Sequence, residues 1–270
     1  MKYSSERVVP ETHQNNWEDY LIFIMHKKTY EFASPYIRNS VVLDFGCGEG
    51  YGTHMLSSFS QHITGIDVNK DTIAKAKNKY SGPHINFQTV QPTEIAPLPF
   101  PNGNFDVILS FQVMEHVTDV NIYLKEICRI LKRGGKVIIA TPNAKFRLLP
   151  FQNPWNKYHT QEFTHEQLKG ILSIFFIEVK ILGQTLKNPW LKVEKKRISF
   201  NKWLLWPFTN KLIPNSIRCL CLRGLGKMAA ALKKSFKKNS APINSDNDPV
   251  VILEENIKEA PFFIAFGTKI

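Results

Sequence analysis

The sequence predicts an α/β fold in which helices cover both faces of a mostly parallel sheet. Residues 41–182 alternate short apolar runs with segments of helical periodicity, the pattern of repeated βαβ units. The chain has 270 residues, of which 43% are hydrophobic and 21% charged, which is enough apolar material for one large core. A glycine-rich turn joins the first apolar run to the next helical segment. Together these observations predict a doubly wound sheet.

The individual elements follow from the periodicity of the apolar residues. Helices are expected over residues 17–32, 51–59, 70–80 and 120–131, and another is expected to begin at Thr164, with Glu166 and Gln167 in its first turn. The apolar runs predict strands over residues 41–45, 62–67, 85–90, 105–111, 136–140 and 175–182.

The last apolar run, residues 261–269, also reads as a strand. If it pairs in the same sheet, the preceding segment is an insertion and not a tail. The expected organisation is an N-terminal helical cap (1–35), an α/β domain (36–183 and 251–270) and a basic helical insertion before the last strand (184–250).

The positive charge is concentrated in this insertion. Residues 187–238 hold fourteen Lys and Arg and one acid, Glu194, whereas the rest of the chain is close to neutral. Residues 216–238 have an apolar helical face crowded by basic residues, and Trp203 and Trp206 lie nearby, a pattern that suits an anionic membrane surface although basic solvated faces are common. The alternative is a helical lobe packed on the sheet with its bases in water. Nucleic acid is a weaker third partner, because no recognised binding module accompanies the basic block.

Other features narrow the location and the chemistry. The longest apolar stretches, such as residues 21–25, are far shorter than the ~20 residues that span a bilayer. The polar start lacks the apolar core of a signal peptide. The four cysteines form no CxxC pair, and Cys219 and Cys221 have no further ligand at metal-binding spacing. We therefore expect a cytoplasmic protein, peripheral to the inner membrane face if the basic segment binds lipid, without a metal site.

The glycine-rich turn has the composition of a ligand-binding loop. Gly46 and Gly48 follow a strand and precede a helix whose first amides are free to meet a ligand. The pattern is G-x-G-x-G and not the G-x-G-x-x-G of dinucleotide sites, because Tyr51 occupies the third glycine position. Asp44 precedes the turn, and an acid there suits a cationic ligand. Asp67 ends the second strand, where an acid can accept both hydroxyls of a ribose.

Four motifs occur in order over about residues 41–183: VVLDFGCGEG, GIDVNKDTIAKA, LPFPNGNFDVILSFQVMEHVTD and LKRGGKVIIATPN. This series resembles the class I S-adenosylmethionine-dependent methyltransferases, which have a Rossmann-like fold. The segments ERVVPE and YHTQEFT resemble a bacterial subset that often acts on sugars, glycans or glycolipids. The resemblance implies an enzyme with S-adenosylmethionine as cofactor and a small-molecule or glycan acceptor.

The resemblance also implies roles for individual residues. Asp44 would contact the amine of the cofactor, directly or through water, and Asp67 would hold the ribose. Glu94 is the candidate for the adenine amine, although Gln91 is an alternative because this stretch is longer than usual in the family. Other residues would line the cofactor: Gly46, Cys47 and Gly48 beneath the methionine part, Val68 against the adenine, and Ser110 and Gln112 beside the methionine.

Methyl transfer mainly requires alignment, and a base is needed when the acceptor is a hydroxyl. His159, in the long connection after the fifth strand, is the candidate base, although it can equally brace this loop against Glu162 or Glu115. Glu115 and His116 are expected to be mainly scaffold and cap groups. His26 and Tyr30, in the first helix, could close over the cofactor, but packing of that helix is their favoured role.

The expected reaction is O-methylation of a sugar, glycan or lipid-linked glycan. One alternative is a methyltransferase for a quinone-like or other small aromatic acceptor. An alternative of another class is a non-catalytic, membrane-associated scaffold that binds the cofactor.

Overall fold

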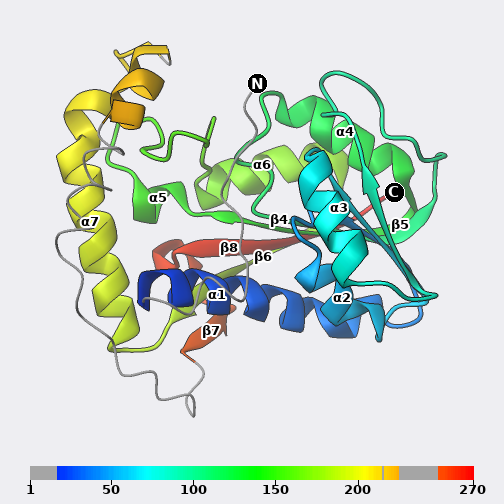
Figure 1. Cartoon of the computed structure of the whole chain (residues 1–270). Coiled ribbons are helices and arrows are strands. Elements are labelled where there is room, and N and C mark those ends of the chain that lie inside the picture. The colour runs from blue at the N-terminus through cyan, green and yellow to red at the C-terminus, as the bar shows by residue number, and fades with distance from the viewer. Residues whose placement is uncertain (1–16, 215, 225–248) are drawn as a thin grey trace.

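A computed structural model describes residues 17–214, 216–224 and 249–270. Its centre is an eight-stranded sheet with the order β3-β2-β1-β4-β5-β8-β6-β7 (Figure 1). The strands are β1 (Val41–Phe45), β2 (His62–Asp67), β3 (Ile85–Thr89), β4 (Phe105–Phe111), β5 (Leu131–Pro142), β6 (Ile177–Leu186), β7 (Val250–Leu253) and β8 (Phe262–Thr268).

The sheet is mostly parallel, as predicted. Strands β1 to β5 pair in parallel with their neighbours, whereas β8 lies antiparallel between β5 and β6. The strand predicted near the C-terminus is therefore confirmed as a member of the same sheet. Strand β7 was not predicted; it is short and pairs antiparallel with β6 at the edge of the sheet.

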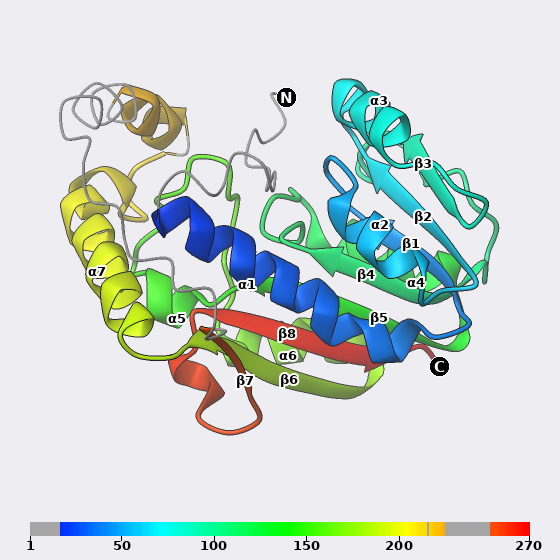
Figure 2. The same cartoon turned by 60° about the horizontal axis from the view of Figure 1, so that its bottom comes forward.

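The helices cover both faces of the sheet. They are α1 (Trp17–Ala33), α2 (Tyr51–Ser57), α3 (Lys70–Lys79), α4 (Val120–Ile130), α5 (Ala144–Arg147), α6 (His165–Phe175) and α7 (Trp190–Thr209), with short 3₁₀ turns at Ser34–Ile37 and Ile257–Glu259. Residues 216–224 are also helical. Figure 2 shows α1 crossing one face of the sheet, with α4 and α6 behind it on the other. Tyr30 and Leu56 anchor the core on the first face, and Tyr123 and Leu168 anchor it on the second.

Polar side chains define where several helices begin. The Asp119 carboxylate accepts hydrogen bonds from the amides of Asn121 and Ile122 at the start of α4. Thr164 and Gln167 form a reciprocal capping box at the start of α6, which confirms the predicted start of this helix.

Strand β6 differs from its prediction at both ends. It begins at Ile177 because the amide of Phe176 still donates to the carbonyl of Leu172 in the last turn of α6. It continues to Leu186 because β7 supplies partners there, with Gln184 opposite Ile252 and Leu186 opposite Val250.

The first part of the basic insertion packs against the N-terminal helix. Leu21 and Met25 of α1 form an apolar cluster with Leu186, and Trp190 and Leu191 at the start of α7 pack against it. The helix predicted over residues 216–238 is described as far as residue 224, and the remainder, with Lys233, Lys234, Lys237 and Lys238, lies outside the described residues. Within the described ranges, no helix is both long enough and apolar enough to cross a membrane.

Candidate active site

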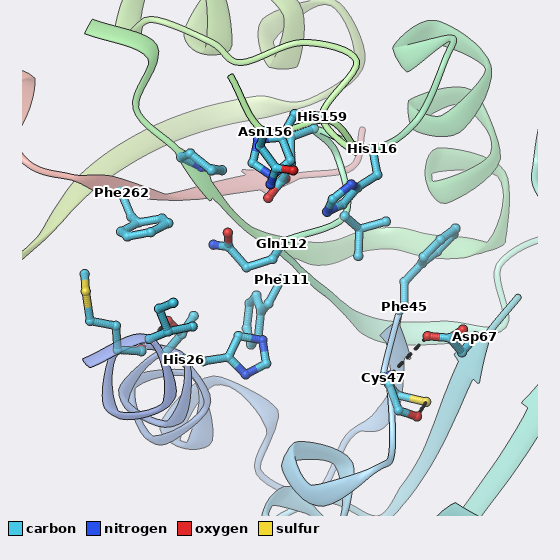
Figure 3. A pocket seen from close by; sticks show the side chains of 18 of the residues that line it. His26, Phe45, Cys47, Asp67, Phe111, Gln112, His116, Asn156, His159 and Phe262 are labelled. Carbon is cyan, nitrogen blue, oxygen red and sulfur yellow. Dashed lines mark hydrogen bonds between the residues drawn. The ribbon is translucent and has the colours of Figure 1, made fainter. Parts of the chain in front are cut away.

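A cavity of about 700 Å³ opens beyond the carboxyl ends of β1, β2 and β4, where ligands bind in sheets of this topology. Asp67 and Cys47 lie at one end, and His159 and Phe262 lie at the other (Figure 3). Of the residues predicted from the sequence, those lining the cavity are Gly46, Cys47, Gly48, Asp67, Val68, Gln112 and His159. Asp44, Glu94 and Ser110 do not line it.

The glycine-rich turn is held tightly between β1 and β2. The amides of Gly46 and Cys47 both donate to the carbonyl of Ile66, at 2.8 and 2.9 Å. Gly46 has a φ of +80°, and a Cβ there would lie 2.3 Å from Cγ2 of Val113, so only glycine fits. The turn therefore presents bare backbone to the cavity.

Asp67 is fixed at one end of the cavity by two backbone amides. Its Oδ2 accepts from the amide of Gly48 at 3.2 Å, and its Oδ1 accepts from the amide of Asn69 at 2.8 Å. Val68 and Val90 line the cavity beside it. The cavity therefore places a carboxylate between a glycine turn and an apolar wall.

Asp44 lies buried beneath the turn. Its carboxylate accepts hydrogen bonds from the hydroxyl of Thr53 at 2.6 Å and from that of Tyr30 at 3.1 and 3.2 Å. Burial raises the pKa of Asp44 to about 6. A Cβ on Gly52 would lie 2.2 Å from the Tyr30 ring, so this glycine lets α1 approach closely enough for Tyr30 to reach Asp44. The N-terminal helix is thereby tied to the acid that precedes the glycine turn.

The other residues predicted around the cofactor differ in position. Ser110 is buried, and its hydroxyl accepts from that of Tyr123 at 2.6 Å. Glu94 accepts from the amide of Thr118 at 2.8 Å, so it ties two loops together outside the cavity lining. Gln112, at the end of β4, lines the cavity between its two ends, and its φ of +58° is one that non-glycine residues rarely adopt (Figure 3).

His159 is part of a buried charged chain. Its Nδ1 lies 2.7 Å from Oε1 of Glu162, and Nε of Arg147 lies 3.0 and 3.1 Å from the two oxygens of the same carboxylate. Burial alone would raise the pKa of Glu162, but the Arg147 guanidinium and the His159 ring outweigh it and hold that pKa below its ordinary value. The bracing contact with Glu162 is therefore present, and His159 also faces the cavity.

Glu115 and His116 join His159 at the same end of the cavity. One ligating atom from each of the three side chains lies within 4.8 Å of the other two. The rings of His116 and His159 meet edge to face, with their centroids 4.8 Å apart. Glu115 also has the scaffold role expected from the sequence, since its backbone carbonyl accepts from the amide of Thr160 at 2.9 Å. No sequence spacing indicated this cluster, because His159 is far from the other two along the chain.

Three further residues of this region were missed by sequence reasoning. Arg147 follows the end of β5 and stacks over the ring of Trp155 at 4.4 Å. Its position just after a central strand was the one available signal. Arg218, buried in the basic insertion, donates to the backbone carbonyls of Pro154 and His159. No sequence pattern indicated this contact, because it forms only when the insertion packs against the connection that holds Pro154 and His159.

Known proteins resemble this chain in sequence. Residues 43–139 match the family described as a methyltransferase domain. A probable S-adenosylmethionine-dependent methyltransferase of Mycobacterium tuberculosis is 29% identical over 183 residues, which cover 67% of this chain and 63% of that relative. The chain thus matches less than two thirds of that relative's length. A ubiquinone biosynthesis O-methyltransferase of Bradyrhizobium diazoefficiens is 33% identical over 108 residues, which cover 39% of this chain and 41% of that protein.

Solved structures share the fold at low sequence identity. A Thermotoga maritima protein described as an S-adenosylmethionine-dependent methyltransferase, possible histamine N-methyltransferase, has a TM-score of 0.56 and 16% identity, covering 94% of this chain and 95% of that one. The [4+2]-cyclase SpnF has a TM-score of 0.57 and 15% identity, covering 99% of this chain and 86% of that one. Residues 43–139 are therefore similar to a methyltransferase domain, the relative named above is called S-adenosylmethionine-dependent, and the solved structures share the fold.

Proposed function

We propose that this protein transfers a methyl group from S-adenosylmethionine to an oxygen of a sugar, a glycan or a lipid-linked glycan. The observation that carries the proposal is the cavity itself, which joins the Asp67 carboxylate at one end to His159 at the other. Gln112 lies between them, so a ligand held by Asp67 and an acceptor beside His159 would meet near this residue.

The chain mainly positions the reactants. When bound, S-adenosylmethionine supplies an electrophilic methyl group whose sulfur leaves as a neutral thioether. Asp67 holds the ribose, the backbone of Gly46, Cys47 and Gly48 passes beneath the methionine part, and Gln112 lies at its reacting end. Asp44 contributes a buried negative charge beneath the turn. Glu94 or Gln91 remains the proposed partner of the adenine amine, and Ser110 is proposed to support the methionine side from within the core.

His159 is proposed to act on the acceptor hydroxyl. In a metal-free site its Nε2 receives the hydroxyl proton while the oxygen forms its bond to the methyl carbon and the carbon–sulfur bond breaks. The Glu162 carboxylate, 2.7 Å from Nδ1, orients the ring and stabilises the charge that the ring then gains. Arg147 keeps Glu162 ionised for that purpose.

The acceptor end of the cavity is amphiphilic. Leu21, Met25 and Phe262 give it an apolar wall, whereas Glu194 and Arg197 of α7 add charged groups. Such a wall favours an acceptor with an apolar part, as a lipid-linked glycan has. A quinone-like acceptor is the alternative, supported by the relatives named ubiquinone biosynthesis O-methyltransferases. If the protein is instead a non-catalytic scaffold, it should bind the cofactor but show no turnover.

We further propose that α7 contacts an anionic membrane. Three exposed positions of α7 hold large apolar side chains: Phe200, Trp203 and Leu204 are 65%, 67% and 55% exposed. Lys192, Lys195 and Lys196 are exposed earlier on the same helix. Aromatic and basic side chains on one helix suit the boundary between headgroups and acyl chains. This contact would bring the cavity, to which α7 contributes Glu194 and Arg197, close to lipid-linked acceptors.

Calorimetry followed by a methyl-transfer assay tests the proposal. We expect heat on titration with S-adenosylmethionine and none with NAD, and labelled methyl transfer to one member of a panel of free glycans, lipid-linked glycans and quinone-like phenols. His159→Ala should lower turnover by ~10²–10⁴-fold with cofactor affinity retained, and the exposed His84→Ala should change neither. Binding of NAD in place of S-adenosylmethionine would end the methyltransferase proposal.

A further inference from the structure

We propose that Glu115, His116 and His159 bind one divalent transition-metal ion at the acceptor end of the cavity. The three side chains come from two separate segments, the loop between β4 and α4 and the connection after β5, and their ligating atoms already lie within 4.8 Å of one another. All three residues line the cavity (Figure 3 labels His116 and His159). The inference deepens the proposed function: the ion's role in methyl transfer rests on that function, whereas the binding of the ion does not.

The contacts of the two imidazoles favour metal ligation through the same ring atom. Nδ1 of His116 lies 3.1 Å from the carbonyl oxygen of Tyr158, which can only accept, so this nitrogen carries the proton. Nδ1 of His159 lies 2.7 Å from the Glu162 carboxylate, which places the proton there too. With Nδ1 protonated, each ring would bind a metal ion through Nε2. Metal-binding histidines show this arrangement, in which an outer carbonyl or carboxylate fixes the tautomer.

Glu115 supplies an independent indication. Its carboxylate is buried, and Oε2 accepts from the hydroxyl of Thr141 at 3.1 Å. Its other oxygen, Oε1, is buried with no hydrogen-bond partner among the residues that the structure describes. An unsatisfied carboxylate oxygen in a buried position is costly, and a cation removes that cost.

The ligand chemistry selects the kind of ion. Two imidazoles and one carboxylate are the set of many catalytic Zn²⁺ sites, in which the fourth position is left to water or substrate. Mg²⁺ prefers oxygen ligands and keeps several waters, so it should bind this set weakly. Ligand atoms ~2.1 Å from a four-coordinate ion lie ~3.4 Å apart, so binding would draw the three side chains slightly closer together.

An ion here would change the role of His159. As a ligand, Nε2 of this ring does not receive the proton. Instead the acceptor hydroxyl, bound at the open position, is acidified by the ion and loses its proton to solvent before its oxygen bonds to the methyl carbon. The ion would also orient the acceptor, because its three ligands line the same cavity as Gln112 and Asp67.

Metal titration of the chelator-treated, full-length protein tests the inference without any assay of turnover. Zn²⁺ and Mn²⁺ should each bind with a stoichiometry of one, and Mg²⁺ at least tenfold more weakly than Zn²⁺. Glu115→Gln, His116→Gln and His159→Gln should each weaken Zn²⁺ binding at least tenfold. The exposed His84→Gln controls for adventitious binding to surface imidazoles. Circular dichroism of each variant establishes that it folds.

Cofactor binding, measured in the same samples, separates this inference from the proposed function. Zn²⁺ binding lost only in the three cluster variants supports the site, whether or not S-adenosylmethionine binds. Normal S-adenosylmethionine binding without stoichiometric Zn²⁺ binding overturns the metal site and leaves His159 as the proposed base. Equal Zn²⁺ binding by the folded cluster variants and the wild type also overturns it.

Discussion

The guanidinium of Arg218 donates a hydrogen bond to the backbone carbonyl of His159, at 3.3 Å. It also donates to the carbonyl of Pro154, a few residues earlier in the same connection. Arg218 belongs to the basic insertion, so this segment helps to hold the loop that brings His159 to the cavity. Its positive charge therefore has a structural use at one position at least, in addition to any contact with an anionic partner.

Arg218→Ala should destabilise the protein and lower turnover. The variant leaves two buried carbonyls without their donor, and hydrogen bonds to charged groups typically contribute ~1.5–3 kcal/mol. We expect a lower urea midpoint and at least a tenfold loss of turnover, with S-adenosylmethionine affinity retained because the cofactor end is remote. Arg223→Ala, on the exposed side of the same helix, is the matched control. Identical behaviour of the two variants would refute the supporting role of Arg218.

Asp67→Asn should weaken S-adenosylmethionine binding by ~10–100-fold. The substitution removes the charge that the ribose hydroxyls would meet while keeping the shape of the side chain, and such a loss corresponds to ~1.5–3 kcal/mol. Isothermal calorimetry measures it directly. Asp71→Asn, an exposed acid in the first turn of α3, controls for a general change in local charge. Unchanged affinity in the Asp67 variant would remove this residue from the cofactor site.

Asp44 should make stability depend on pH between about 4 and 6. The folded protein raises the pKa of this carboxyl from 3.8 to about 6, so within that window the folded state binds more protons than the unfolded chain. The stability that Asp44 contributes is fully present below the unfolded pKa of 3.8, and it is lost as the pH rises through the folded pKa of about 6.

Asp44→Asn cannot lose a proton at this position, which isolates the effect. Relative to the wild type, the variant should gain up to about 3 kcal/mol of unfolding free energy between pH 4 and pH 7. Urea unfolding of both proteins across this range measures the difference, and other titrating groups cancel in the comparison. A difference that does not vary with pH would mean that Asp44 keeps an ordinary pKa.

The fold was largely predictable because its signals are local. Apolar runs specified seven of the eight strands, and Thr164 with Gln167 marked the start of α6. Strand β7 was missed because its four residues follow a polar loop and gain their partners only when β6 extends to Leu186. The domain boundaries stay a prediction, although the insertion does leave after β6 and return before β8.

The site was predictable at its cofactor end and less so at its acceptor end. Gly46, Gly48 and Asp67 lie close together in the motif series, and they line the cavity as predicted. Arg147, Glu162 and His159 meet only through the folding of a long connection, and Arg218 reaches them from the insertion. Contacts of this kind depend on tertiary packing, which a periodic pattern does not encode.

The exposed face of α7 should bind anionic vesicles in a salt-sensitive way and neutral vesicles weakly. Each Lys near an anionic surface contributes ~1 kcal/mol, and the attraction fades within ~8 Å at physiological salt. Replacing Lys192, Lys195 and Lys196 by Gln should therefore reduce binding at least tenfold. Trp203→Ser combined with Leu204→Ser should weaken the vesicle binding that persists at high salt, because it removes apolar side chains that would enter the boundary between headgroups and acyl chains.

Co-sedimentation at low and high salt measures both effects, and the change of Lys233, Lys234, Lys237 and Lys238 to Gln extends the test to the basic residues outside the described ranges. Asp71→Asn serves as the control, because α3 lies at the other end of the sheet (Figure 2). If the intact protein does not sediment with anionic vesicles, the basic segment is a solvated lobe and the membrane proposal is wrong. The proposal of methyl transfer would stand after that result. It depends on the residues that line the cofactor end of the cavity, which lie on β1, β2, β4 and the loops that follow them.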